Sequence, residues 1–381
     1  SLGEVVQPDV LIIVIESARA SMVPGFPGRD IKAQMPHLQR FMATARRYDR
    51  AYTTTSHTSK ALIGLLCGIH PFPAMEIRES TLNGLPFPCL PKLLANVGYR
   101  SLFIQSATEH FESRRGLIGN MGFETAYFKE QIAEQYLSSG YFGLDEMAMV
   151  QPFKTWWQQS EGRPRFVFML TSMTHHPYQE LGRVKPTGML ASKSAYLNNL
   201  NYTDRMMGDV LSWLQTRNEL DNTVVIITGD HGESFGEHQL NQHDSVPYEE
   251  GVRVPLAIKF PGGKVQVGHD TALRQHIDLL PTVIDLAGAV ITGELPGKSL
   301  LRADRHEQLI TSCWWADSCI SLISGMHKSI YLPSRDQLLH YALGEDLQEH
   351  RDIAATLPAV ERNQLIYEAL RHRASVRLLY S

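Results

Sequence analysis

The chain lacks the features that would place it in several broad classes. Its 381 residues contain no run of the roughly 18 apolar residues that a helix needs to span a bilayer, and no secretory signal is visible. A net charge of −4 gives no basic excess, which argues against nucleic-acid binding. Internal repeats and low-complexity tracts are absent as well. What remains is a chain long enough to bury one large core together with a subdomain.

Cysteine is also scarce, with only Cys67, Cys89, Cys313 and Cys319. This number neither requires nor excludes disulfides. Cys313 and Cys319 are able to pair in an oxidising compartment, but a sequence alone does not reveal which cysteines pair.

Short, β-branched apolar runs alternate with helical stretches over most of the chain. The strands are expected at residues 10–15, 100–104, 166–170, 224–227 and 256–260. The helices are expected at residues 35–45, 89–97, 195–217 and 276–286. This alternation predicts an α/β fold, in which a mostly parallel central sheet is sandwiched by helices.

The pattern changes after about residue 290. Shorter strands are expected at residues 308–312, 321–324 and 328–331, which suggests a small antiparallel sheet, and a helix near 359–373 would close it. We therefore expect a metal-dependent catalytic α/β domain over residues 1–290 and a C-terminal α+β subdomain over residues 291–381 that packs on it.

The segment at residues 223–238 carries the strongest functional signal. It reads as a buried strand that ends in a glycine-flanked turn holding Asp230 and His231. A carboxylate beside an imidazole suits a divalent metal, and ligands of open α/β sheets bind where strands end. A solvated loop is the alternative interpretation.

A second predicted strand delivers Glu16 at its tip, directly after six apolar residues. Because an unpaired buried carboxylate is costly, Glu16 is expected to be another metal ligand. A surface glutamate that caps the next helix is the alternative.

Hydroxyl side chains crowd the start of a predicted helix that runs from Ser59 to about Cys67. The free N–H groups at a helix N-terminus bind phosphate, although a single Ser or Thr more often caps the helix. A metal nearby would lower the pKa of such a hydroxyl and make it a nucleophile.

Together these segments resemble the alkaline phosphatase and sulfatase superfamily. Residues 229–238 and 248–256 are similar to the sulfatase second-half signature, and residues 276–288 resemble the segment that comes after it. Residues 295–301 and 340–346 look like late landmarks of the family. The match covers nearly the whole chain in the right order.

The nucleophile position separates the branches of this superfamily. Sulfatases carry a Cys or Ser followed by x-Pro-x-Arg, which is converted to formylglycine. Alignment on residues 66–71 places Thr58 there, with neither the Pro nor the Arg after it. Thr58 and Ser59 instead resemble the Thr-Ser pair of lipoteichoic acid synthases, and phosphoethanolamine transferases also use Thr. Thr58 is thus the expected nucleophile and fourth metal ligand, with Ser59 as the alternative.

Two further segments resemble the lipoteichoic acid synthase branch. Residues 169–178 are similar to its Thr-x-x-Asn-His-x-Pro motif, which makes His175 the expected catalytic histidine, with a turn histidine as the alternative. Residues 109–115 resemble its Phe-Trp-Asn-Arg run, which puts Arg114 where that family binds phosphate. Residues 143–146 are a weaker match to the same branch.

Other positions depart from this branch or stay open. Gln105, Glu112 and Phe235 stand where it has a His, a Trp and a Ser, so the head group stays open. His243 lies where sulfatases have a sulfate-binding Lys and phosphoethanolamine transferases have a His. It is expected to bind a phosphate oxygen or a second metal together with His175, with a surface histidine as the alternative. Lys60 is expected to bind substrate, with a solvated side chain as the alternative.

The resemblance implies a metal-dependent phosphotransferase. It would move phosphoglycerol or phosphoethanolamine from phosphatidylglycerol or phosphatidylethanolamine to a glycan or lipid acceptor, through a phosphothreonine-linked intermediate. The metal would be Zn or Mn, as one ion or two. A phosphodiesterase or phosphonate monoesterase is the enzymatic alternative, and a non-catalytic relic that binds glycan or lipid is another.

The same resemblance implies a location. Related transferases are usually membrane-anchored, with the catalytic domain outside the cytoplasmic membrane. We therefore expect the chain on the periplasmic side of the bacterial inner membrane, at the membrane surface, held by an N-terminal anchor outside this sequence.

Overall fold

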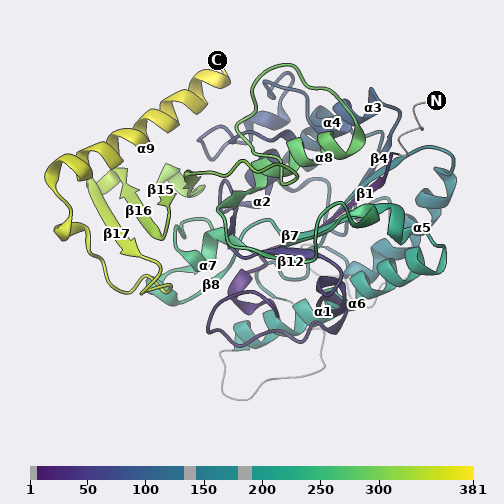
Figure 1. The fold of residues 1–381 in the computed structure, drawn as a ribbon, viewed down its shortest axis with the longest axis horizontal. Helices are drawn as coiled ribbons and strands as arrows, with labels where there is room; N and C mark the ends of the chain where they lie inside the picture. Colours follow the sequence, from purple (N-terminus) through teal and green to yellow (C-terminus); the bar gives the residue numbers. More distant parts are fainter. Residues whose placement is uncertain (1–6, 133–142, 179–190) are drawn as a thin grey trace.

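The computed structural model describes residues 7–132, 143–178 and 191–381 (Figure 1). Its centre is an eight-stranded sheet in the order β12-β2-β11-β7-β1-β6-β4-β5. Within this sheet only β11 runs antiparallel to its neighbours. The strands of this sheet are β1 (Asp9–Ile15), β2 (Arg46–Tyr48), β4 (Arg100–Gln105), β5 (Thr125–Tyr127), β6 (Arg165–Leu170), β7 (Thr223–Gly229), β11 (Leu256–Lys259) and β12 (Gly268–Asp270).

Helices cover both faces of the sheet, because its central strands are apolar on both sides (Figure 1). Along β1, the even-numbered side chains from Val10 to Val14 pack on one face and the odd-numbered ones from Leu11 to Ile15 on the other. The first face is covered by α2 (Thr58–Cys67), α3 (Leu90–Ala95), α4 (Arg114–Met121) and α8 (Leu279–Ala287). The second is covered by α1 (Pro36–Met42), α5 (Val150–Gln159) and α6 (Ala191–Thr216). The predicted α/β fold is confirmed.

Shorter strands form two small sheets apart from the central one. A three-stranded sheet contains β10 (Arg253–Val254), β3 (Ala51–Tyr52) and β13 (Arg274–Gln275), and a hairpin contains β8 (Ser234–Phe235) and β9 (Asn241–Gln242). The short helix α7 (Glu249–Val252) precedes β10.

The C-terminal part forms a separate antiparallel sheet, as predicted (Figure 1). Its strands are β14 (Gln308–Ser312), β15 (Ile320–Ser324), β16 (His327–Leu332) and β17 (Gln337–Ala342), and α9 (Ala359–Leu379) packs against it. The sequence analysis missed β17, since the adjacent Leu338 and Leu339 break the alternation that marks a half-buried strand. The domain boundary near residue 290 stays a prediction.

Two disulfides hold these elements together. Cys67 at the end of α2 is bonded to Cys89 just before α3, and Cys313 is bonded to Cys319 between β14 and β15. Among the residues that the structure describes, no helix is both long enough and apolar enough to cross a membrane.

Candidate active site

The candidate site lies where β1 and β7 end. These neighbouring strands are parallel, and Ile15 is paired with Gly229. The next residues, Glu16 and Asp230, therefore leave the sheet side by side at the same edge. This is the edge at which open α/β sheets bind ligands.

The two carboxylates are buried. In each, one oxygen accepts hydrogen bonds and the other has no hydrogen-bond partner among the described residues. Asp230 Oδ1 accepts the backbone N–H groups of Ser17 and His231, both at 2.8 Å. Glu16 Oε1 accepts the Ser17 hydroxyl at 3.0 Å. Asp230 Oδ2 and Glu16 Oε2 have no hydrogen-bond partner among the described residues. Buried oxygens of this kind are costly unless something such as a cation binds them.

His231 presents its second ring nitrogen to these oxygens. Its Nδ1 lies 2.8 Å from the carbonyl oxygen of Gly232 and is therefore the donor nitrogen. Its Nε2 lies 3.4 Å from Asp230 Oδ2 and 3.8 Å from Glu16 Oε1. Burial lowers the pKa of His231 to about 4, so the ring is neutral near pH 7 and its Nε2 lone pair faces the carboxylates.

The electrostatics of the cluster also favour a cation. Burial, followed by the charges of Asp230 and Glu233, raises the pKa of Glu16 well above its ordinary value. The pKa of Asp230 is lowered despite its burial, mainly by the neighbouring His231. Ligand atoms of Glu16, Asp230 and His231 all lie within 4.8 Å of one another. These residues fit a divalent metal ion.

Thr58 faces this cluster from the first turn of α2. Its Oγ1 lies 3.2 Å from His231 Nε2 and donates to Glu16 Oε1 at 3.4 Å. Ser59 points elsewhere, because its hydroxyl donates to Glu112. Of the two hydroxyls that the sequence left open, only that of Thr58 adjoins the candidate metal ligands.

Arg114 lies beside the start of the same helix. Its side chain is 1% exposed, and its guanidinium donates to Ser59 Oγ and to Gln105 Oε1, both at 3.1 Å. Arg114 Nε has no partner among the described residues. The position suits an anion at the Thr58 hydroxyl, and phosphate binding by Arg114 stays a prediction.

A second group of metal-type side chains adjoins the first. His57, His243 and Asp244 have ligand atoms within 4.8 Å of one another. The His243 ring stacks on that of His231, with centroids 3.9 Å apart. The His57 ring stacks on Trp314, with centroids 3.8 Å apart.

His175 lies at the rim of the site rather than in either group. It follows β6, is half-buried, and its ring centroid is 6.3 Å from that of His243. Glu146 supports this loop by accepting the backbone N–H groups of Ser172 at 3.0 Å and Met173 at 2.7 Å. The expected role of His243, in binding a phosphate oxygen or a second metal together with His175, stays a prediction; ligand atoms of His57 and Asp244 lie within 4.8 Å of one of its ring nitrogens.

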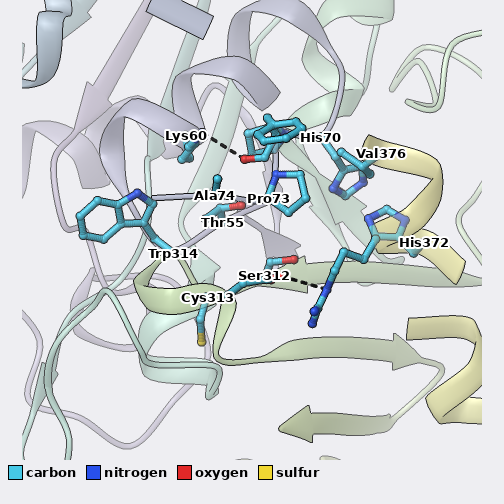
Figure 2. A pocket seen from close by; sticks show the side chains of 14 residues that line it. Thr55, Lys60, His70, Pro73, Ala74, Ser312, Cys313, Trp314, His372 and Val376 are labelled. Carbon is cyan, nitrogen blue, oxygen red and sulfur yellow. Dashed lines mark hydrogen bonds and ion pairs between the residues drawn. The ribbon is translucent and has the colours of Figure 1, made fainter. Parts of the chain in front are cut away.

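Lys60 does not reach the candidate site, so the expectation that it binds substrate is wrong. Its ammonium lies 2.9 Å from Glu79 and donates to the carbonyl oxygens of Phe72 and Glu76. Two residues along a helix rotate the side chain by about 200°, which turns Lys60 away from the Thr58 side. Figure 2 shows it among the residues that line an adjoining pocket, together with His70, Pro73 and Trp314.

Three residues near the site were missed by the sequence analysis: Glu233, Asp244 and Trp314. The sequence offers a clue to Glu233 and Asp244, because these acidic residues lie close to His231 and His243 along the chain. Trp314 lies between Cys313 and Cys319, which are bonded at a sequence separation of 6, and its backbone N–H donates to the Asp244 carbonyl oxygen at 3.0 Å. Nothing local in the sequence predicts that contact.

Comparison with known protein families and sequences gives three findings. The sulfatase family model matches residues 8–289 of the chain. An uncharacterized sulfatase, YidJ, from Escherichia coli (strain K12) is 24% identical over an alignment that covers 77% of this chain and 71% of that protein. Arylsulfatase K from Danio rerio is 41% identical over 100 residues, which cover 26% of this chain and 18% of that relative.

Solved structures share the fold over most of the chain. A protein of the alkaline phosphatase superfamily from Vibrio parahaemolyticus has a TM-score of 0.79 at 17% identity, covering 98% of this chain and 88% of its own. The lipoteichoic acid synthase LtaP from Listeria monocytogenes has a TM-score of 0.69 at 16% identity, covering 90% and 88%. The phosphonate monoester hydrolase SpPMH from Silicibacter pomeroyi has a TM-score of 0.72 at 17% identity, covering 97% and 96%.

Proposed function

The chain belongs to the sulfatase family within the alkaline phosphatase superfamily, and from this membership we propose that it is a metal-dependent phosphotransferase. Members of this superfamily are enzymes that act on sulfate or phosphate esters. The proposed reaction moves a phosphoglycerol or phosphoethanolamine head group from a phospholipid to a glycan or lipid acceptor.

One observation carries the choice of phosphate over sulfate. The hydroxyl that adjoins the candidate metal ligands belongs to Thr58, and the residues after it are Ser59, Lys60, Ala61 and Leu62. The Pro and Arg of the sulfatase motif are absent, and a Thr is not a substrate for conversion to formylglycine. An unmodified hydroxyl at a helix N-terminus suits direct attack on phosphorus.

Each residue at the site would have a separate role in the reaction. Glu16, Thr58, Asp230 and His231 would hold the metal ion, which when bound stabilises the alkoxide and polarises a phosphoryl oxygen. The Thr58 oxygen attacks the phosphodiester in line, and the O–P bond that forms replaces the bond to the leaving alcohol. The acceptor alcohol then attacks the phosphothreonine and releases Thr58.

Proton transfers accompany both steps. His175 and His243 adjoin the site, and burial is the main cause that lowers the pKa of each to about 4. Both rings are therefore neutral near pH 7. In the first step one of them would take the proton of Thr58 and pass it to the leaving alcohol, and in the second step it would take the proton of the acceptor alcohol and return it to Thr58. Arg114 is placed to balance the charge on the non-bridging oxygens.

The donor, acceptor and location form part of the same proposal. Phosphatidylglycerol or phosphatidylethanolamine would be the donor, and the membrane surface would supply it. The Cys67–Cys89 and Cys313–Cys319 disulfides support an oxidising compartment outside the cytoplasm, since such bonds are rare in reducing ones.

Intact mass spectrometry tests this function. The metal-loaded chain is incubated with vesicles of phosphatidylglycerol or of phosphatidylethanolamine, and the Thr58→Ala variant is treated in parallel. We expect a head-group adduct on the wild type that the variant lacks, and Ser59→Ala serves as the matched control that keeps the adduct.

Two results would contradict the proposal. Turnover of a soluble phosphodiester, with no adduct from either lipid, would favour the hydrolase alternative. Turnover of an aryl sulfate with no action on any phosphodiester would return the chain to sulfate ester hydrolysis.

A further inference from the structure

A cavity of about 920 Å³ lies beside the C-terminal end of α9. It is enclosed by α9, by α8 and the loop after it, by the segment that leads into α3 and by the end of α2. Among the described residues, none of those that adjoin the candidate metal site lines it. Its volume falls within the range of about 300–1,000 Å³ that is usual for ligand-binding pockets. We call it the α9 cavity.

Apolar side chains make up most of the lining of the α9 cavity. Leu93, Leu280 and Val376 come from three different helices and are buried. Phe87 and Val290 line it as well, yet they are 51% and 84% exposed. The apolar lining therefore continues to the surface of the protein, where its contact with water is unfavourable. A hydrocarbon chain that entered from this side would cover it.

The α9 cavity also has hydrogen-bonding groups but almost no charge. His70 and His372 line it with ring centroids 4.5 Å apart, and neither ring has a hydrogen-bond partner among the described residues. Burial lowers the pKa of His372 to about 4 and is the main cause that lowers the pKa of His70, so both rings are neutral near pH 7. Glu294 carries the one formal charge among the described lining residues, and no Lys or Arg is among them to hold an anion. Such a lining suits an uncharged chain with an ester or a hydroxyl at its end.

A cation lies beside this lining rather than in it. Arg371 is exposed on α9, one helical turn before Ser375, which lines the cavity. Residues one turn apart are neighbours on the surface of a helix, and a guanidinium binds phosphate well. An uncharged interior with an arginine beside it matches a molecule that has an apolar tail and an anionic head.

The α9 cavity adjoins the small pocket of Figure 2. The two share His70, His372 and Val376, and the small pocket is also lined by Trp314. The Trp314 ring stacks on that of His57, which immediately precedes α2. A molecule in the α9 cavity would therefore lie next to the pocket that borders the candidate active site.

We propose that the α9 cavity binds an acyl chain of a phospholipid, with the phosphate of that lipid beside Arg371. The match to a hydrocarbon chain rests on the lining alone, whereas the choice of a phospholipid rests on the proposed function. A bound acyl chain would hold this part of the protein at the membrane surface, because each buried CH₂ group adds to the affinity.

Binding of short-chain lipids tests the proposal without turnover. The probes are lysophosphatidylglycerols that carry a hexanoyl, octanoyl or decanoyl chain, used below the concentrations at which they form micelles. They are titrated calorimetrically into the full chain after chelator treatment, with both disulfides intact. Each added CH₂ group should lower Kd about fourfold, the factor that corresponds to about 0.8 kcal/mol. A Kd that does not change with chain length would overturn the proposal.

Two exposed valines provide a matched pair of variants. Val290 lines the α9 cavity and is 84% exposed, whereas Val360 is 82% exposed at the other end of α9 and is not part of the lining. Val290→Asp should raise the Kd of the decanoyl probe about tenfold or more, because a carboxylate would lose water beside the chain. Val360→Asp should keep the wild-type Kd. Equal Kd values in Val290→Asp and the wild type would overturn the proposal.

Cross-linking locates the site without any variant. A decanoyl probe with a diazirine at the end of its chain should modify peptides that contain Leu93, Leu280 or Val376, and cross-links confined to other peptides would overturn the proposal. Failure of the proposed function gives a different result. A Kd that depends on chain length, with no Thr58 adduct from any phospholipid, would keep the hydrocarbon site and reject phosphotransfer. A Thr58 adduct with a Kd that is independent of chain length would do the reverse.

Discussion

Replacing Lys60 by methionine is expected to destabilise the fold and leave the chemistry at Thr58 intact. Lys60 is 1% exposed and Glu79 is 0% exposed, and their charged atoms lie 2.9 Å apart. The ammonium also donates to the carbonyl oxygens of Phe72 at 3.0 Å and Glu76 at 2.8 Å. Methionine fills a similar volume but leaves the Glu79 charge buried without a counter-ion.

The expected loss of folding free energy comes from the unpaired Glu79 charge. Removing one partner of a buried ion pair costs about 3–5 kcal/mol, whereas replacing both with uncharged groups of similar volume is often neutral. Glu79 also accepts the backbone N–H of Phe72 at 2.7 Å, and glutamine keeps an acceptor there. The double variant Lys60→Met/Glu79→Gln should therefore recover most of the free energy of unfolding.

Denaturant unfolding at pH 7, with both disulfides intact, measures these free energies. Lys92→Met is the matched control, because Lys92 is exposed on α3. At a temperature where every variant is folded, kcat/KM for a soluble phosphodiester should stay close to the wild-type value. An unchanged unfolding midpoint together with a loss of kcat/KM beyond about tenfold, or about 1.4 kcal/mol, would refute the reasoning and return Lys60 to substrate binding.

Three further outcomes are expected. Arg114→Lys keeps the charge but loses the planar guanidinium. Because a charged hydrogen bond contributes about 1.5–3 kcal/mol, kcat/KM should fall about 10- to 150-fold. An unchanged kcat/KM would contradict phosphate binding by Arg114. Burial acts to raise the pKa of Glu237, but Arg19 at 2.8 Å outweighs it and lowers the pKa from 4.5 to about 2. The resulting stabilisation is present above pH 4.5 and is lost as the pH falls toward 2. The Tm of Glu237→Gln should therefore fall less than that of the wild type across this range. An equal fall of Tm in both proteins would count against the ion pair. Replacing Cys67 and Cys89 together by alanine opens a loop of 22 residues and should cost about 3 kcal/mol in denaturant unfolding, and a cost below about 1 kcal/mol would contradict the loop-entropy estimate.

The strand ends were predictable because their geometry is local. Two β-branched runs each end in an acidic residue, and neighbouring parallel strands deliver the residues after them to one edge of the sheet. The sequence therefore places Glu16 and Asp230 at the same edge of the sheet, and the pairing of β1 with β7 brings them side by side. The position of Thr58 at the start of a helix was also predictable, because hydroxyl residues precede an apolar helical stretch.

The partners of each side chain were not predictable in the same way. Whether Lys60 points to substrate or to the core depends on Glu79, which another segment buries beside it. His57 and Asp244 are 187 residues apart and meet only because two loops close over the same strand ends. No periodicity or spacing within either loop encodes that contact.

The sequence by itself determined the α/β class, the superfamily and the residues at the strand ends, because these depend on periodicity and on short-range order along the chain. Tertiary structure alone decided that Trp314, from the disulfide loop between β14 and β15, stacks on His57. It also decided that carboxylates lie beside a ring nitrogen of His57 and of His243. Such contacts join segments far apart in sequence, and their geometry is set by how the loops pack over the sheet edge.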